Sequence, residues 1–254
     1  MDQRDQRYIE EALAVQQETV ALFPDDIVSR NGLADTLRQV GRLEEALNIY
    51  RETVATFPHD VVSRDGLAET LRQLSHPQDA VSVYRETLAL FPHDVVARTG
   101  LAEALKQLGC LQDALQLYQE TIMLFPNHVP ARDGFADTLR QSGRFEEAVS
   151  MLRETVAAYP QDVAASLMLA DTLIRMGQDG EAITLYRDLV HRFPSNPVVR
   201  NGLAEALRCA AAIGREPYGN ESGGLTATVS YIDLRKDTVE TVIQAVLKKL
   251  GSAA

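Results

Sequence analysis

Hydrophobic and polar positions along this chain follow a pattern that returns every 34 residues. In the first copy, Leu33, Leu37 and Val40 have the i, i+4, i+7 spacing of an amphipathic helix. A constant interval of this length predicts that one two-helix unit is stacked repeatedly, because a lone unit cannot bury its apolar face. A proline preceded by an aromatic residue marks each interval, at Pro24, Pro58, Pro92, Pro126, Pro160 and Pro194.

The second half of each unit predicts another helix. Gly41 interrupts the first helical pattern, as glycine does at a helix C-terminus. A second apolar series runs through Ala46, Tyr50 and Phe57, and Pro58 ends it. Each unit is therefore expected to form a helix, a tight turn and a second helix. The corresponding interruptions in later units are Gly109, Gly143 and Gly177.

The recurring columns resemble the tetratricopeptide repeat over roughly residues 10 to 212. The resemblance implies an all-α fold, a right-handed α-solenoid of stacked antiparallel helix pairs with a short C-terminal strand and helix as a tail. One departure is an arginine where the family has a large aromatic residue. An arginine stem can cover apolar surface while its head reaches water or an acid such as Glu52. The columns are Leu33, Ala34, Gly41, Ala46, Tyr50 and Pro58, and the arginines Arg30, Arg64, Arg98, Arg132 and Arg200.

We expect four parts along the chain. Residues 1–26 form an N-terminal half-repeat, a capping helix; residues 213–224 form a linker and residues 225–254 a tail with a capping or docking helix. That helix replaces the missing second helix of the sixth repeat, folds back onto Leu167 and Ile174, or pairs with a second molecule. The array, 27–212, holds five full repeats and a sixth first helix: 27–60, 61–94, 95–128, 129–162, 163–196 and 197–212.

Charge and cysteine content narrow the class of partner and the compartment. The formal net charge of −11 argues against nucleic acid or an anionic membrane as the main partner, since both favour a basic patch. Cys110 and Cys209 are too few to form a disulfide framework, which favours a reducing compartment. The chain shows no apolar signal core and no membrane-spanning run, so we expect a cytoplasmic protein.

The candidate binding surface is the side of each first helix that faces away from the core. With Leu33 facing inward, Val28, Asn31, Asp35 and Arg38 cluster on the opposite side, a face not needed for packing within the unit. In proteins that the chain resembles, this face lines the inner wall where peptides or partner helices bind. Its charges also read as a solvated face, stabilised by about 0.2–0.5 kcal/mol per pair. The candidate partner-binding residues are Asn31, Asp35, Arg38, Asp65, Glu69, Arg72, Thr99, Glu103, Lys106, Asp133, Asp137, Arg140, Leu167 and Ile174.

The fifth repeat differs on this face. Leu167 stands where other repeats have Asn or Asp, and Ile174 stands where they have a basic residue. With Ala164, these residues predict an apolar strip, produced either by sequence drift or by something apolar that docks there. Relatives that clamp a C-terminal carboxylate have basic residues and Asn on this face. The acids of this chain would repel a carboxylate, so co-chaperone activity of that kind is not expected.

A glycine recurs inside the first helix, where it costs about 1 kcal/mol relative to Ala. The favoured explanation is a neighbouring helix too close for a side chain, and the alternative is the backbone of a bound ligand. The column comprises Gly32, Gly66, Gly100, Gly134 and Gly202.

The chain carries no phosphate-binding glycine loop, no HExxH zinc helix and no GxSxG nucleophile elbow. His59, His93 and His128 lie about one repeat apart and are expected in turns, so no cofactor and no metal is expected. The sequence predicts a non-catalytic scaffold that binds a peptide or helix of another protein in a concave groove. The alternative is a structural protein that self-assembles through its repeat ends or its tail.

Overall fold

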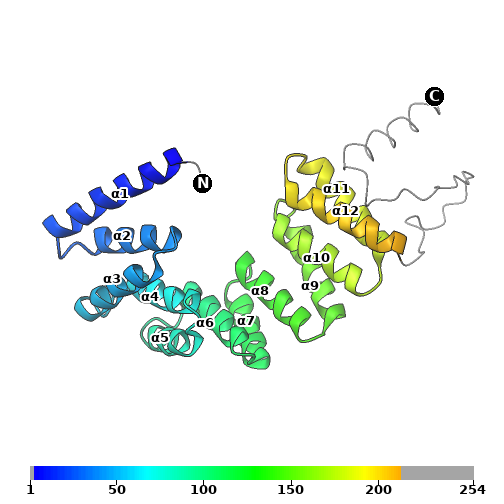
Figure 1. Cartoon of the computed structure of the whole chain (residues 1–254). Helices are drawn as coiled ribbons and strands as arrows, with labels where there is room; N and C mark the ends of the chain where they lie inside the picture. The colour runs from blue at the N-terminus through cyan, green and yellow to red at the C-terminus, as the bar shows by residue number, and fades with distance from the viewer. Residues whose placement is uncertain (1–2, 213–254) are drawn as a thin grey trace, which may run out of the picture. The chain divides into compact units, whose positions relative to one another are not determined.

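The computed structural model describes residues 3–212, and this part of the chain is built entirely from α-helices (Figure 1). The predicted linker, strand and last helix lie outside the described residues. Among the described residues there are twelve helices and no strand. Their bounds are α1 (Gln3–Leu22), α2 (Ile27–Gln39), α3 (Leu43–Thr56), α4 (Val61–Gln73), α5 (Pro77–Leu90), α6 (Val95–Gln107), α7 (Leu111–Leu124), α8 (Val129–Gln141), α9 (Phe145–Ala158), α10 (Val163–Arg175), α11 (Asp179–Arg192) and α12 (Pro197–Ala212).

Two kinds of helix alternate along the chain. The leading helices are α2, α4, α6, α8, α10 and α12, and the following helices are α1, α3, α5, α7, α9 and α11. Leading helices begin at an N-cap side chain that accepts a backbone hydrogen bond, as Asp60 does from the Ser63 N–H at 2.9 Å. Such a cap contributes about 1 kcal/mol. In α8 the imidazole of His128 takes this position and accepts from the Ala131 N–H.

The turn after each of the first five leading helices uses a left-handed residue. Gly41, Gly109, Gly143 and Gly177 have φ between 73° and 82°, a region that glycine enters without strain. In the second repeat Ser75 occupies the same position with φ 63°. The residue after it hydrogen-bonds back to the end of the leading helix. In the first repeat, the Arg42 N–H donates to the Leu37 carbonyl at 2.8 Å. These turns hold the two helices of a repeat antiparallel.

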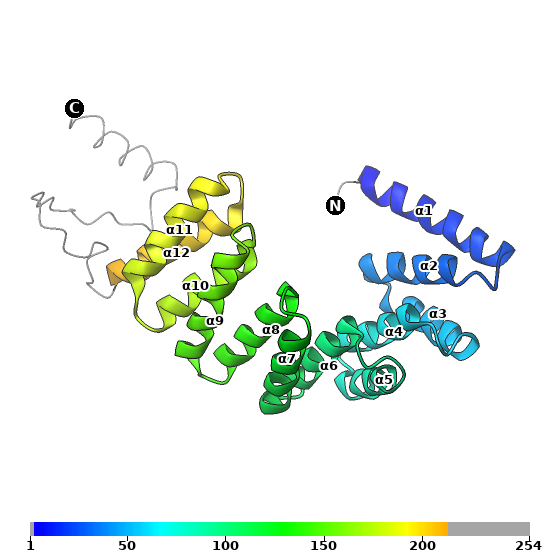
Figure 2. The same cartoon turned by 180° about the vertical axis from the view of Figure 1, so that it is seen from behind.

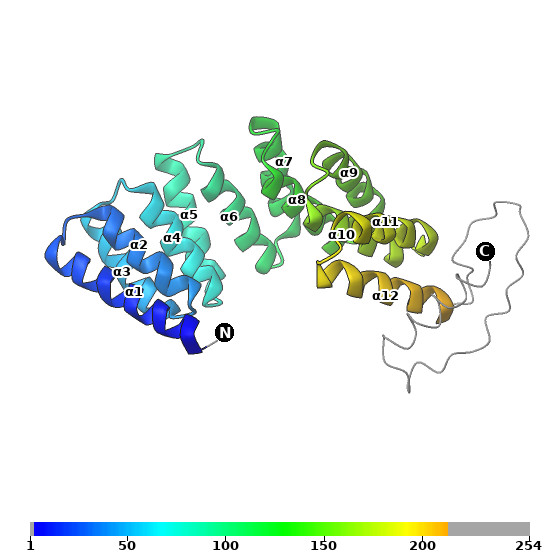
Figure 3. The ribbon, with the colours of Figure 1, turned by 90° about the horizontal axis from the view of Figure 1, so that it is seen from above.

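Every helix packs on the next one along the chain (Figure 2). Each leading helix also contacts the next leading helix, whereas successive following helices do not contact one another in the described part of the chain. The leading helices therefore form a closely spaced inner layer, and Figure 3 shows them lying side by side. The core between the two layers is made of Leu33, Ala34, Leu37, Ala46, Tyr50 and their equivalents.

An arginine joins each repeat to the proline that precedes it. Arg30 Nε donates to the Pro24 carbonyl at 2.6 Å, and its Nη1 lies 3.9 Å from Glu52. The expectation that the arginine head reaches an acid is confirmed at Arg30, Arg64 and Arg98. In the fifth repeat Ser166 takes the arginine position, and Arg192 from α11 donates to the Pro160 carbonyl instead. The equivalent bonds join Arg64 to Pro58, Arg98 to Pro92, Arg132 to Pro126 and Arg200 to Pro194.

The recurring glycine of the leading helices makes room for a tyrosine from the helix just before it in the chain. A Cβ at Gly66 would lie 2.3 Å from the Tyr50 ring, far inside van der Waals contact. The same overlap holds at Gly100, Gly134 and Gly202, which confirms the prediction of a close neighbour there. At Gly32 the prediction was wrong. Its nearest neighbour is Gln16 Nε2 at 3.9 Å, because α1 has Gln16 in the tyrosine position.

The fifth repeat departs from this arrangement at both positions together. Met168 replaces the glycine, and Leu152 replaces the tyrosine. Leu152 is fully buried, and Met168 packs against the same core cluster. A ring over a glycine is thus exchanged for a smaller side chain, Leu152, beside a larger one, Met168.

No helix within residues 3–212 combines the length and the apolar character needed to cross a membrane.

Candidate partner-binding surface

The inner layer carries acid and base pairs three residues apart. In α2, Arg38 lies 2.8 Å from Asp35, and in α4 Arg72 binds Glu69 through two nitrogens at 2.6 and 2.8 Å. Burial alone would raise the pKa of Glu69, but hydrogen bonds from Arg72 and Gln73 lower it. Glu69 is therefore ionised and paired with Arg72 at neutral pH.

From α6 to α10 the pairs extend from helix to helix. Lys106 Nζ lies 2.9 Å from Glu103 and 2.8 Å from Asp137 on the next leading helix. Arg140 pairs with Asp137 at 3.4 Å and also with Asp171 on α10. Burial opposes the charge of Lys106, yet its hydrogen bonds to Asp137 and Glu103 raise its pKa. We call Glu103, Lys106, Asp137, Arg140 and Asp171 the charge row.

The charge row ends at Ile174, which stands where another base would continue it. Ile174 packs against two core clusters on either side of α10, and Leu167 packs against the cluster around Tyr186. Both side chains are half-buried, whereas Ala164 is exposed. The apolar positions of the fifth repeat thus contribute to packing between repeats, in addition to any contact with a ligand.

Asn31 lies in a different environment from the one expected. It is buried, with 8% of its surface exposed, instead of facing solvent. Its Nδ2 donates to Asp60 at 2.9 Å, and Ser63 Oγ donates to its Oδ1 at 2.8 Å. This face was expected to be unnecessary for packing within the unit, but at Asn31 it packs between units. The reason is that neighbouring leading helices pack on one another, so one edge of the face is covered by the next repeat.

Acids take the position of Asn31 in the second and fourth repeats. Asp65 interacts with the N-cap residue Asp94, and Asp133 with the N-cap residue Asp162. Burial, together with the neighbouring carboxyl group, raises the pKa of Asp65 to about 8 and that of Asp133 to about 7. In the third repeat Thr99 takes this position and donates to the Val95 carbonyl at 2.5 Å.

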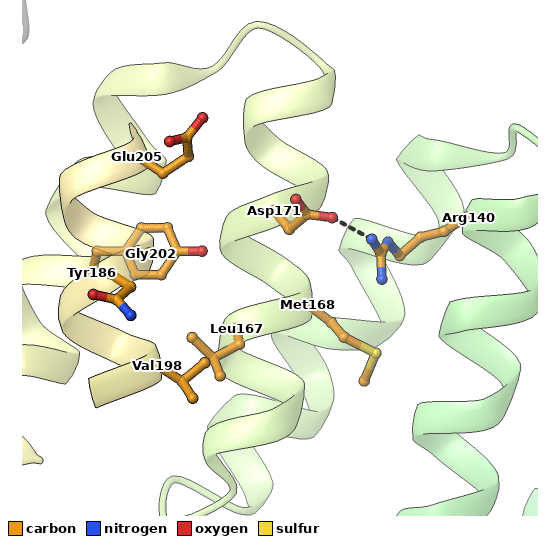
Figure 4. Close-up of a pocket in the computed structure, with 9 residues that line it drawn as sticks. Arg140, Leu167, Met168, Asp171, Tyr186, Val198, Gly202 and Glu205 are labelled. Carbon is orange, nitrogen blue, oxygen red and sulfur yellow. Dashed lines mark hydrogen bonds and ion pairs between the residues drawn. The ribbon is translucent and has the colours of Figure 1, made fainter. Parts of the chain in front are cut away.

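Two grooves open along the inner layer. The larger has a volume of about 730 Å³ and the smaller about 510 Å³, and Met168 borders both. In Figure 4 the smaller groove has Arg140 and Asp171 on one side and Glu205 on the other, with Leu167 and Val198 at its edge. The larger groove is lined by Glu69, Arg72, Tyr84, Val96, Thr99, Gly100, Glu103, Lys106, Tyr118, Val129, Pro130, Asp133, Gly134, Asp137, Asp162 and Met168.

The grooves bring together part of the predicted set. Of the candidate residues, those that line a groove are Glu69, Arg72, Thr99, Glu103, Lys106, Asp133, Asp137, Arg140 and Leu167. Those that lie outside these two grooves are Asn31, Asp35, Arg38, Asp65 and Ile174.

Sequence reasoning missed one contribution to the grooves and named only part of another. Tyr84, Tyr118 and Tyr186 reach them from following helices, because each ring passes over a glycine of the inner layer. Exposed apolar residues in the first turn of the leading helices form a second column. This column has a sequence signal, since an apolar residue recurs outside the core stripe. The valines in it are Val28, Val62, Val96 and Val198.

Sequence comparison identifies the family. One tetratricopeptide repeat model matches residues 71–133, 108–164 and 139–206, and a second matches residues 27–57. The chain belongs to the tetratricopeptide repeat family. A comparison with curated proteins finds no match to this tetratricopeptide repeat protein.

Solved tetratricopeptide repeat structures share the fold. TTC0263 of Thermus thermophilus is 22% identical with a TM-score of 0.61, over 70% of this chain and 97% of that one. A protein from Parabacteroides merdae is 19% identical with a TM-score of 0.64, over 83% and 88%. YrrB, described as having an unusual peptide-binding site, is 18% identical with a TM-score of 0.51, over 73% and 96%. At these identities the likeness establishes a tetratricopeptide repeat solenoid and leaves the ligand open.

Proposed function

We propose that this tetratricopeptide repeat protein is a non-catalytic scaffold that binds an extended or helical segment of another protein along its inner layer. The observation that carries the proposal is the pair of grooves that meet at Met168. They are lined mainly by equivalent positions of successive leading helices, so a ligand lying across them would meet recurring side chains, with Leu167 and Met168 as the departures of the fifth repeat.

The groove lining favours a partner segment with both apolar and basic side chains. Val96, Pro130 and Tyr118 offer apolar contact at the larger groove. The acids in its lining outnumber the bases, since Arg72 and Lys106 are its only basic residues. Opposite charge on the ligand raises the association rate and suppresses wrong partners. Binding is therefore expected to weaken as salt concentration rises. The acids are Glu69, Glu103, Asp133, Asp137 and Asp162.

The peptide-binding site described for YrrB supports this proposal by analogy of fold. The similarity carries no residue of that site to this chain.

A matched pair of substitutions tests where the ligand binds. Val96→Glu places a charge in the larger groove, and Met123→Glu places the same charge on α7, outside both grooves. Both side chains are exposed, at 53% and 76%, so neither change is expected to unfold the protein.

Peptides are first selected on the wild-type protein from a displayed library, and their affinities for both variants are then measured. We expect Val96→Glu to weaken binding by at least about tenfold and Met123→Glu to leave it unchanged. Equal affinities for the two variants would place the binding site elsewhere and overturn the proposal.

A further inference from the structure

The row of described helices begins with a following helix and ends with a leading helix. In α1, Leu13, Gln16 and Thr19 occupy the positions of Leu47, Tyr50 and Thr53 in α3. Helix α1 is the first described helix and contacts α2, whereas α12 is the last described helix and contacts α10 and α11. The two ends are therefore the two halves of one repeat (Figure 3).

The outer face of α1 is apolar and uncovered. Ala12 is exposed, although the equivalent Ala46 in α3 is fully buried. Val15 is 59% exposed, while its equivalent Ile49 packs against the core. Ala12, Val15 and Thr19 have the i, i+3, i+7 spacing that places them on one side of a helix.

The matching face of α12 is also uncovered among the described residues. Ala204 is exposed, whereas its equivalents in the other leading helices are fully buried. Leu207 is 37% exposed, whereas its equivalents are at most 7% exposed. In the other repeats this face packs against the following helix of the same repeat. The equivalents are Ala34, Ala68, Ala102, Ala136 and Ala170, and Leu37, Leu71, Leu105, Leu139 and Leu173.

The two ends also carry the separate halves of a recurring ion pair. Three repeats pair the leading-helix arginine with a following-helix glutamate at 3.7–3.9 Å. Arg200 in α12 keeps its bond to the Pro194 carbonyl at 2.6 Å but has no acid opposite it within residues 3–212. Glu18 in α1 holds the glutamate position, is exposed, and has no base opposite it in the same part of the chain. The established pairs are Arg30–Glu52, Arg64–Glu86 and Arg98–Glu120.

We propose that these ends bind each other between molecules, so that α1 of a second copy takes the following-helix place beside α12. Ala12 and Val15 of one copy then cover Ala204 and Leu207 of the other, and Glu18 meets Arg200. Because the two faces differ, the contact is heterologous, and each molecule keeps one free face of each kind. Association is therefore open-ended and continues the helix packing found within one chain.

The first test is the mass of the full chain in solution, measured by light scattering and by sedimentation over a wide range of concentrations. The weight-average mass is expected to rise continuously with concentration, without a plateau at the dimer. Val15→Glu and Leu207→Glu each put a charge into the contact, and we expect each variant to be monomeric. Met123→Glu is the control that keeps wild-type self-association, and the groove variant Val96→Glu, although expected to weaken peptide binding, should leave self-association unchanged.

Mixing the two monomeric variants is the decisive step. The Val15→Glu chain retains an intact α12 face, and the Leu207→Glu chain retains an intact α1 face. Their mixture is expected to form a one-to-one dimer and nothing larger. This result also shows that both variants are folded, since a misfolded chain would not complement the other.

A charge exchange tests the ion pair separately. Glu18→Arg alone is expected to weaken association by up to about fivefold, and adding Arg200→Glu to the same chain is expected to restore it.

The proposal is overturned if the wild-type chain has the mass of one chain at every concentration. It is equally overturned if the mixed variants stay monomeric, or if Val96→Glu abolishes association, which would place the second copy in the groove.

Discussion

Because a tyrosine ring covers Gly66 but not Gly32, Gly66→Ala and Gly32→Ala are expected to change the free energy of unfolding in opposite directions. Gly66 lies under the Tyr50 ring, so an added Cβ at 2.3 Å must displace the ring. Such overpacking costs about 1–3 kcal/mol. The displacement also breaks the bond of 2.8 Å that the Tyr50 hydroxyl donates to Asp35, a loss of about 1 kcal/mol. Alanine regains about 1 kcal/mol of helix propensity, so Gly66→Ala lowers the free energy of unfolding by about 2 kcal/mol.

Gly32 is the matched control, because it holds the same position one repeat earlier and has Gln16 Nε2 at 3.9 Å as its nearest neighbour. Gly32→Ala keeps the propensity gain without the overlap, so it is expected to raise the free energy of unfolding by about 0.5–1 kcal/mol. Urea unfolding followed by far-ultraviolet circular dichroism measures both changes.

The fifth repeat suggests a double-mutant cycle. Gly66→Met is expected to be strongly destabilising in the wild-type background, because the long side chain enters the space of the Tyr50 ring. In the Tyr50→Leu background it reproduces the pair Leu152 and Met168, and its cost is expected to fall by at least about 1 kcal/mol. The reasoning is refuted if Gly66→Ala and Gly32→Ala shift the unfolding midpoint in the same direction, or if the cycle shows no coupling.

Three further predictions follow from single positions. Ser75→Gly is expected to stabilise the protein by about 1 kcal/mol in a urea titration, because Ser75 has φ 63° where the other turns have glycine; a lower midpoint would contradict this. The pKa is raised to about 8 at Asp65 and to about 7 at Asp133. Their protonated forms stabilise the fold fully below the unfolded pKa of 3.8, and this contribution is lost progressively as pH rises from there through 7–8. The free energy of unfolding should therefore fall as pH rises from about 4 to about 8 and then level off, and it should fall less in Asp65→Asn and Asp133→Asn; identical slopes in all three proteins would refute the assignment. Arg72→Glu is expected to weaken ligand binding and to cost about 1 kcal/mol of stability, because it replaces an ion pair with Glu69 by a repulsion; unchanged affinity for selected peptides would remove Arg72 from the site.

The helical architecture could be predicted because its determinants are local and repeated. Leu33, Ala34 and Leu37 recur with helical spacing, and Gly41 recurs where a left-handed turn is needed. The reason for the glycine column could be predicted only in outline. The close neighbour is a tyrosine ring from another helix, and sequence spacing within one helix carries no information about that contact.

The details of the candidate surface depend on neighbouring repeats and were beyond the sequence. A helical wheel of one helix places Asn31 on the exposed side, yet the next leading helix covers it. The bond from Arg30 to the Pro24 carbonyl was also missed, since a backbone acceptor leaves no trace in side-chain patterns. The charge row was anticipated within each helix, but its continuation from Lys106 to Asp137 across helices required coordinates.

Site-specific crosslinking between the protein and a bound ligand tests the central claim most directly. A photoreactive amino acid is placed at Thr99, in the larger groove, or at Met123, on the exposed surface of α7. With a peptide selected on the wild-type protein, we expect a crosslinked product from position 99 and none from position 123. A product from position 123 alone would contradict binding along the inner layer.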